Sequence, residues 1–296
     1  MPPRRHFRLR LPTGALELGP RTLIMGVLNV TPDSFFDGGA FLDPRRAVAH
    51  ALRMQRDGAD IIDIGAESTR PGSHGVTAAE ELRRLLPVLE ALRSRLRIPV
   101  SIDTQKSSVA EIALGAGASI INDVSGLKTD PRLAQVAARR RVPLILMHMR
   151  GTPPTMQEKP FAKNVLQDVT AGLRRSVALA RSAGVARSQI ILDPGIGFGK
   201  SFSQNYQLLA NFPALAKLGY PLLVGTSRKG FLAAALAKRS PAGARKPAPI
   251  AERIWATAAT ITASILGGAH IVRVHDVKEM SQVARAADCV LAAFFR

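Results

Sequence analysis

The sequence predicts a single (β/α)8 barrel over residues 1–296, and three observations lead to this prediction. Short runs rich in Val, Ile and Leu recur eight times along the chain, and each suits a strand that is buried on both faces. The segments between these runs have the apolar spacing of amphipathic helices. Nearly every run ends in polar residues, which is where a barrel of this kind builds its site. On pattern alone, a doubly wound open sheet remains the alternative.

The chain begins with a segment that predicts a β-hairpin. The stretch FRLRLPTGALEL alternates apolar and polar residues around a turn at Thr13 and Gly14. A hairpin within residues 1–20 would close the floor of the barrel. The eight strand runs follow at residues 22–30, 60–68, 98–104, 119–126, 142–149, 189–197, 220–227 and 270–276.

Three of the intervening helices have recognisable start signals. A proline in the first turn of a helix costs little, because the N–H that it lacks would have no partner there. A Thr followed three residues later by Glu has the spacing of a capping box. The helix starts predicted in this way are Asp43 with Pro44, Thr77 with Glu80, and Asp130 with Pro131.

One segment between the predicted elements has little to bury. Residues 238–249, KRSPAGARKPAP, consist mainly of Pro, Gly, Ala and basic residues. We therefore predict a mobile loop there.

The formal net charge of +19 raises the question of a nucleic-acid partner. Basic residues are scattered over the predicted helix faces, and an aromatic content of 5% leaves few platforms on which bases could stack. We therefore expect no nucleic-acid partner. We attribute the charge to a solvated, arginine-rich surface that also attracts an anionic substrate.

The number of cysteines indicates the redox environment of the protein. Cys289 excludes an intrachain disulfide, which suits a reducing, cytoplasmic location. It lies in the apolar segment ADCVLAAFF, so we expect a small buried residue. The N-terminus lacks the features of a signal peptide, and we expect none. The longest uncharged stretch, IWATAATITASILGGAHIV, contains hydroxyl residues and a Gly-Gly break, so we expect no membrane span.

Polar side chains gather where the predicted strands end, and in a (β/α)8 barrel these ends surround one mouth. Any one of them could be a helix cap, but the convergence of eight ends favours a site. Carboxylates and carboxamides can hydrogen-bond the edge of a flat heterocycle, and cations after the last strands suit a phosphate. In order, the polar residues are Asn29; Asp63 and Glu67; Asp103; Asn122 and Asp123; His148; Asp193; Ser227, Arg228 and Lys229; and Arg273, His275 and Asp276.

Two segments of the sequence resemble known binding motifs but do not meet their requirements. The segment GIGFGKS resembles a phosphate-binding loop, but Pro194 stands at the required first glycine. Lys200 stands where a dinucleotide fingerprint needs its third glycine. His148 has no second His or Cys at ligand spacing, which argues against a zinc site. We expect these glycines to let the backbone pass close to a bound ring.

Eight motifs together resemble those of the dihydropteroate synthase family, in order and over most of the chain. They are NVTPDSFFDGG, IIDIGAESTRPG, SIDT, INDVSG, MHMRGTPPTMQ, DPGIGFGK, TSRKGF and VRVHDV. The resemblance implies a folate-pathway transferase, a target of sulfonamides, with Mg²⁺ as cofactor. Its small-molecule substrates would be 4-aminobenzoate and a 7,8-dihydropterin diphosphate, joined at the pterin methylene with release of pyrophosphate.

The resemblance also implies roles for individual residues. The pterin pocket would be lined by Asp103, Asn122, Asp193, Lys229 and Gly225, with Met147 and Phe198 as apolar walls. The diphosphate would contact Asn29, Thr69, Arg70, Arg273 and His275. Asn29 would also be the protein ligand of Mg²⁺. The aminobenzoate would contact Phe36, Thr69, Pro71, Ser227 and Lys229. The residues expected to act in catalysis are Asp103, Lys229, Arg273, His275, Asp33 and Arg70.

The crowded first loop, NVTPDSFFDGG, has an expected role in this scheme. With the STRPG loop after the second strand it would form a lid that substrate and metal order, and Asp33 would pair with Arg70 on closure. Phe36 stands where relatives often carry a smaller or polar residue, so the shape of the aminobenzoate slot and the response to sulfonamides stay open. Gln105 and Ala66 also depart from the family pattern.

Two other functions stay open at this point. A pterin-binding methyltransferase barrel shares the Asp, Asn, Asp set but lacks the NVTPDSF loop and the SRK element found here. A non-catalytic protein that binds nucleic acid would explain the charge but not the polar mouth. For the assembly we expect a homodimer, with the apolar last helices as its interface.

Overall fold

The computed structural model describes residues 4–31, 43–69, 72–73, 75–156, 162–239 and 245–294. Eight parallel strands lie side by side in the order β8-β7-β6-β5-β4-β3-β12-β9. A bridge between Leu192 and Leu222, with a bond of 2.9 Å from the Leu192 N–H to the Pro221 carbonyl oxygen, joins the two ends. The sheet is therefore closed, so the predicted barrel is confirmed and the open sheet is wrong. The strands are β3 (Leu23–Asn29), β4 (Ile61–Gly65), β5 (Val100–Asp103), β6 (Ile120–Asp123), β7 (Leu144–Met147), β8 (Ile190–Asp193), β9 (Leu223–Val224) and β12 (Ile271–Val274).

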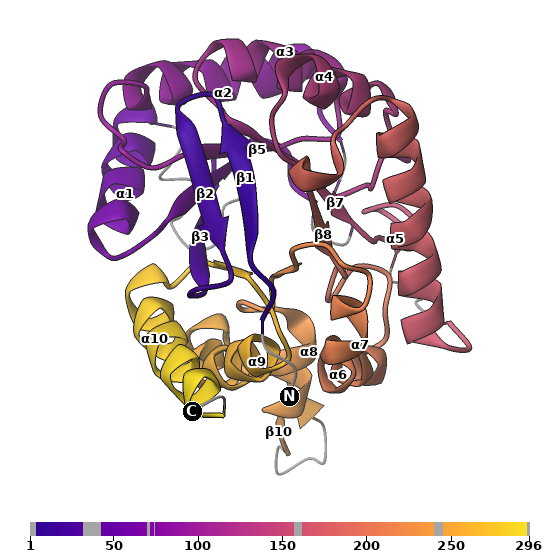
Figure 1. The fold of residues 1–296 in the computed structure, drawn as a ribbon. Helices are drawn as coiled ribbons and strands as arrows, with labels where there is room; N and C mark the ends of the chain where they lie inside the picture. Colours follow the sequence, from indigo (N-terminus) through magenta and orange to yellow (C-terminus); the bar gives the residue numbers. More distant parts are fainter. Residues whose placement is uncertain are drawn as a thin grey trace.

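Helices surround the barrel and cover its outer face (Figure 1). Each predicted strand run is followed by at least one helix in the described part of the chain. These helices are α1 (Pro44–Arg56), α2 (Ala78–Leu92), α3 (Ser107–Gly115), α4 (Arg132–Arg140), α5 (Val165–Ser182), α6 (Phe202–Ala210), α7 (Phe212–Ala216), α8 (Gly230–Ala235), α9 (Ile254–Leu266) and α10 (Val277–Ala293).

The predicted hairpin closes the barrel floor. Strands β1 (Phe7–Leu11) and β2 (Gly14–Leu18) pair antiparallel, and the hairpin lies across the barrel in Figure 1. Leu9 and Leu18 are fully buried, and burying one such side chain contributes about 1.5–3 kcal/mol. They pack against inward-facing residues of the strands, namely Leu23, Met25, Ile61, Ile120, Ile145, Ile191, Leu223 and Ile271.

The same strands build both the floor and the mouth, because alternate residues of a strand face the same side. A floor isoleucine is followed two residues later by a polar residue that faces the mouth. The pairs are Ile61 and Asp63, Ile120 and Asn122, Ile191 and Asp193, and Ile271 and Arg273.

Two of the three predicted helix starts are confirmed. Helix α1 begins at Pro44, and the Asp43 side chain accepts a bond of 2.9 Å from the Arg45 N–H. Thr77 caps α2 by accepting a bond from the Glu80 N–H at 3.2 Å. The Glu80 carboxylate does not complete a capping box, because it bonds the side chains of two following arginines.

The third start differs in detail. Helix α4 begins at Arg132 with Pro131 as its N-cap, and Asp130, one residue earlier, accepts a bond of 3.1 Å from the Arg132 N–H. The Asp130 carboxylate also accepts bonds from the Ser107 N–H at 3.0 Å and from the Arg132 side chain at 2.8 Å. It therefore ties the start of α3 to the start of α4.

The range 238–249 is described in part, and the mobility expected there stays a prediction. Strands β10 (Lys238–Arg239) and β11 (Arg245–Lys246) pair antiparallel. Beyond them, the Ala248 N–H bonds the Ala233 carbonyl oxygen at 3.2 Å. Residues 240–244 lie outside the described part.

The expected burial of Cys289 is wrong, because its segment is a helix with only one buried face. Ala284, Ala287 and Leu291 of α10 face the core, whereas Cys289 is exposed. Within the described residues, no helix combines the length and the apolar character needed to cross a membrane.

His270 joins the N-terminal segment to the barrel. Its Nδ1 accepts a bond of 3.1 Å from the Leu222 N–H, and its Nε2 lies 3.0 Å from the Arg5 carbonyl oxygen. A neutral imidazole with its proton on Nε2 satisfies both contacts. Burial lowers the pKa of His270 to about 4.

The protonation of His270 predicts acid sensitivity. As the pH falls below about 6.5, the unfolded chain takes up a proton that the folded protein refuses until about pH 4. Folding should therefore lose on the order of 3 kcal/mol over this window. His270→Gln should remove this part of the decline in urea denaturation at pH 7, 6, 5 and 4. His50→Gln, on α1, is the control, and identical pH slopes in both variants would contradict the prediction.

Candidate active site

The strand ends bring the predicted polar residues into one ring. Asn29, Gly65, Asp103 and Asn122 are successive register partners across β3, β4, β5 and β6. On the next pair of strands, Met147 is the partner of Asp193. Strand register thus aligns Asn29, Asp103 and Asn122 on one side of the mouth and sets Met147 beside Asp193.

Arg273 ties this ring together. Its Nε donates to Asp63 Oδ2 at 2.6 Å, and its Nη2 donates to Asp103 Oδ2 at 3.0 Å. Asp63 Oδ2 also accepts a bond of 3.0 Å from the Asn122 amide. Asp63 is fully buried, and its role as the partner of Arg273 was not predicted. Arg273, which was predicted to bind an anion, therefore also neutralises two carboxylates of the pocket. These bonds use Nε and Nη2, and neither uses Nη1.

Burial sets the protonation of the pocket groups. It raises the pKa of Asp103, with the Arg273 guanidinium acting in the opposite direction and Asp63 adding to the rise. Burial also raises the pKa of Asp193, which Lys229 opposes. The pKa of Lys229 is lowered to about 8 by burial, against the attraction of Asp193. The pocket therefore holds groups whose pKa values are shifted by burial and by charged neighbours, a pattern typical of functional sites.

Lys229 lies beside the predicted apolar wall. Its Nζ is 4.6 Å from the centre of the Phe198 ring and donates to the Ile196 carbonyl oxygen. A methyl group added at Gly225 would stand 3.6 Å from Arg273 Cβ and 4.0 Å from Lys229 Nζ, so the bare glycine leaves this face open. Phe198 in turn packs on a buried cluster of Val124, Met147, Met149 and Met156. A flat ring would find apolar contact here and hydrogen-bonding groups at its edge.

A buried lysine supports this wall from below. Lys200 Nζ donates to the carbonyl oxygens of Gly195 (2.8 Å), Phe198 (3.0 Å) and His148 (3.0 Å), and it lies 3.1 Å from His148 Nδ1. Burial lowers the pKa of His148 to about 2, so the ring is neutral. The sequence placed His148 among the polar residues of the mouth and singled out Lys200 only to dismiss a motif. Their shared task is to join the loops that follow β7 and β8.

The SRK segment is shaped by a left-handed residue. Arg228 has φ of 62°, and its guanidinium pairs with Asp276 outside the ring. Such a conformation costs about 1–3 kcal/mol for a non-glycine residue. It places the flanking Ser227 so that its hydroxyl lies 3.0 Å from His275 Nδ1. Two predicted site residues, from the segments after β9 and β12, therefore meet.

The second loop is described only in part. Thr69 is half-buried at the mouth, just beyond Glu67, whose carboxylate bonds Val76 and Lys106. Asp33, Phe36, Arg70 and Pro71 lie outside the described residues, and with them the predicted lid.

The metal prediction rests on one described donor. Asn29 ends β3, half-buried, and offers a hard carboxamide oxygen. In the part of the chain that the structure describes, no three His, Cys, Asp or Glu side chains group as a metal cage. This donor set suits Mg²⁺, which commonly binds through one or two protein oxygens together with substrate phosphates and water.

Comparison with known proteins connects this site to a family. The model of the pterin binding enzyme family matches residues 25–275. A dihydropteroate synthase of Synechocystis is 47% identical over 287 residues, which cover 96% of both chains.

Solved structures agree in fold. The Yersinia pestis dihydropteroate synthase in a complex with a sulfonamide drug is 40% identical, with a TM-score of 0.88 and coverage of 97% of this chain and 99% of that chain. The Xanthomonas albilineans dihydropteroate synthase with 4-aminobenzoic acid is 39% identical, with a TM-score of 0.86 and the same coverage of the two chains.

Proposed function

Since this chain belongs to the pterin-binding enzyme family, we infer that it catalyses the dihydropteroate synthase reaction. In that reaction the amine of 4-aminobenzoate displaces pyrophosphate from the methylene carbon of a dihydropterin diphosphate. One observation carries the inference: Asp103, Asn122 and Asp193 meet Arg273 and Lys229 at a single barrel mouth. Relatives similar over nearly the whole chain are dihydropteroate synthases.

The arrangement suits recognition of a pterin edge. We propose that the carboxylates of Asp103 and Asp193 accept hydrogen bonds from ring N–H groups, and that Asn122 offers both a donor and an acceptor. Met147 and Phe198 would contact the ring faces, with Gly225 and Lys229 beside them.

The chemistry requires charge stabilisation more than proton transfer. As the carbon–oxygen bond breaks, positive character develops on the methylene and negative charge develops on the departing diphosphate. Arg273, His275 and Thr69 would stabilise that negative charge. Asp103 would stabilise the positive character through the ring. The arylamine is unprotonated at neutral pH, so its nitrogen attacks without a strong base and loses its proton afterwards.

We propose Mg²⁺ as the cofactor, held by Asn29 together with the diphosphate. When bound, it would add a fixed positive charge beside the leaving group. The aminobenzoate would lie near Ser227 and Lys229, and Thr69 would contact it from the second loop.

We also propose a homodimer and a cytoplasmic location. Trp255, Val290 and Phe294 of α9 and of the C-terminal region are 80%, 50% and 59% exposed, an apolar face that a second copy would cover. A single cysteine suits a reducing compartment.

The direct test is pyrophosphate release from pterin diphosphate and 4-aminobenzoate, with and without Mg²⁺. Release that needs both substrates supports the function, and a loss on chelation that Mg²⁺ reverses supports the cofactor. Folded protein that releases no pyrophosphate would exclude the proposed activity.

Asp193→Asn should weaken pterin binding. Asp193 accepts a bond of 2.7 Å from the Gly195 N–H, and Asn would present an N–H group where ring N–H donors need an acceptor. A mismatched buried polar group costs on the order of 1–3 kcal/mol. Calorimetry with a non-reacting pterin checks this, with Asp168→Asn, a more exposed acid of α5, as the control. Equal affinity in wild type and Asp193→Asn would contradict the pocket assignment.

A further inference from the structure

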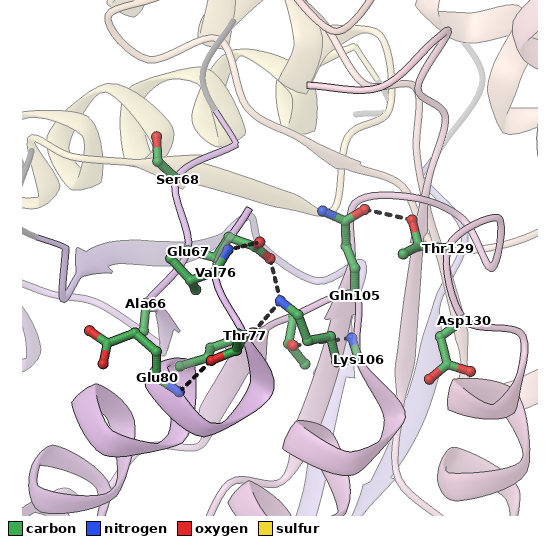
Figure 2. A network of polar contacts seen from close by, with 12 residues as sticks. Ala66, Glu67, Ser68, Val76, Thr77, Glu80, Gln105, Lys106, Thr129 and Asp130 are labelled. Carbon is green, nitrogen blue, oxygen red and sulfur yellow. Dashed lines mark hydrogen bonds and ion pairs between the residues drawn. The ribbon is translucent and has the colours of Figure 1, made fainter. Parts of the chain in front are cut away.

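The segment that carries Thr69 is closed at its base by one carboxylate. Glu67 Oε1 accepts a bond of 2.9 Å from the Val76 N–H, at the other end of the loop. Glu67 Oε2 accepts a bond of 2.8 Å from Lys106 Nζ, which belongs to the next strand–helix unit. Figure 2 shows Glu67 between these two partners.

Lys106 is itself held from two sides. Its Nζ also donates to Glu81 Oε2 at 2.7 Å, and the Glu81 side chain is fully buried in α2. Burial lowers the pKa of Lys106, but its bonds to Glu67 and Glu81 outweigh burial and raise it, so the ammonium keeps its charge. Lys106 precedes α3 and follows Asp103 by three residues. The contact therefore connects the loop after β4 to the strand that ends in Asp103.

Other contacts fix the same base. The Ser73 hydroxyl donates to the Ser68 carbonyl oxygen at 2.7 Å, and Arg84 Nη1 donates to the Ala66 carbonyl oxygen at 2.9 Å. Gly75 leaves room for the carboxylate, because a Cβ there would stand 2.9 Å from Glu67 Oε1. Thr69 lies on the loop between these fixed points.

We propose that Glu67 is a positioning residue for the reaction. By joining Val76 to Lys106, its carboxylate holds the loop so that Thr69 is presented at the mouth in one place. This proposal rests on the proposed function, because Thr69 matters only where a diphosphate or an aminobenzoate meets it. Glu67 itself need not touch the substrate.

Glu67→Gln keeps the size of the side chain and removes the charge that holds Lys106. The KM for 4-aminobenzoate should rise about tenfold, in the range of coupling seen between contacting residues. Affinity for a pterin without phosphates, which the loop does not hold, should stay within about twofold. Glu111→Gln is the control, since Glu111 on α3 is also an ion-paired carboxylate, bonded to Arg139 and Arg140, but lies away from the loop.

A second variant perturbs the contact without removing a charge. Gly75→Ala pushes against the Glu67 carboxylate and should raise the same KM in the same selective way. Gly115→Ala is its control, because a Cβ at Gly115 meets no atom within 4 Å. Gly75→Ala therefore keeps the proposal testable even where Glu67→Gln does not fold.

The decisive measurement repeats Glu67→Gln and Gly75→Ala in a Thr69→Val background. If Glu67 acts through Thr69, the tenfold effect should shrink to about twofold or less. Undiminished effects in that background, or an equal loss of pterin affinity, would overturn the proposal. Wild type that releases no pyrophosphate would remove the proposed function instead, so the two failures are distinguishable.

Discussion

Replacing Arg273 by alanine is expected to lower turnover by about 10²–10³-fold, the size of effect seen when a donor to a developing anion is removed. The structure adds a second consequence. Asp63 and Asp103 would lose the guanidinium that lies 2.6 and 3.0 Å from their oxygens, and a buried carboxylate without a partner takes up a proton. A protonated Asp103 accepts hydrogen bonds poorly, so pterin binding should weaken as well.

A double variant separates the two consequences. In Asp63→Asn/Arg273→Met one carboxylate leaves together with the cation, so the excess negative charge of the single variant is avoided. We expect affinity for a phosphate-free pterin to recover in calorimetry, while pyrophosphate release stays slow. If release recovers together with pterin affinity, Arg273 serves only to neutralise the pocket acids. Arg139→Ala, on the exposed face of α4, is the control.

Replacing Lys200 by methionine is expected to destabilise the protein by about 1–3 kcal/mol for each buried carbonyl oxygen that is left without its donor. The carbonyl oxygens of Gly195 and His148 would lose a donor with which they form buried hydrogen bonds. The turn cannot shift to compensate. Gly195 has φ of 66°, and even an added Cβ would lie 2.0 Å from the His148 carbonyl oxygen. Chemical denaturation at pH 7 measures the loss.

The pH dependence of folding stability shows how much of the effect is due to the titration of Lys200. Burial lowers the pKa of Lys200 to about 7, from about 10.5 in the unfolded chain. Between these values the unfolded state holds a proton that the folded state lacks, so stability rises with pH. Lys229 contributes with the same sign, and the difference between wild type and Lys200→Met therefore isolates Lys200. Lys217→Met, which removes an exposed lysine at the end of α7, should show neither effect. A Lys200→Met protein as stable as Lys217→Met would contradict this assignment.

Much of the fold was predictable because its signals are local. Runs such as those around Ile121 and Ile191 are apolar enough to be buried on both faces, and Asp43 and Thr77 mark helix starts within three residues. The hairpin that closes the barrel floor was predictable because apolar and polar residues alternate along its two strands. Cys289 was misplaced because an apolar composition does not say which face of α10 looks outward.

The site was predictable in position but not in its internal pairing. Asp103, Asn122 and Asp193 could be located because each ends a strand. Asp63 could not be assigned to Arg273, because 210 residues separate the two in sequence and only barrel closure brings them together. The same holds for Glu67 with Lys106, where the useful signal was a carboxylate just after a buried strand. Pairs of this kind depend on contacts between residues far apart in the sequence, and local sequence patterns do not reveal such contacts.

The hairpin on the floor has a consequence for the order of events. Leu9 and Leu18 pack with the inward-facing strand residues and fill that end of the barrel, so ligands reach the strand ends from the mouth. Under the proposed function, the pterin lies beside Asn122 and Asp193, and the aminobenzoate lies above it at the rim. We therefore expect the pterin diphosphate to bind first, because an aminobenzoate already at the rim would block its path. Pyrophosphate and the product would then leave on the side from which the substrates came.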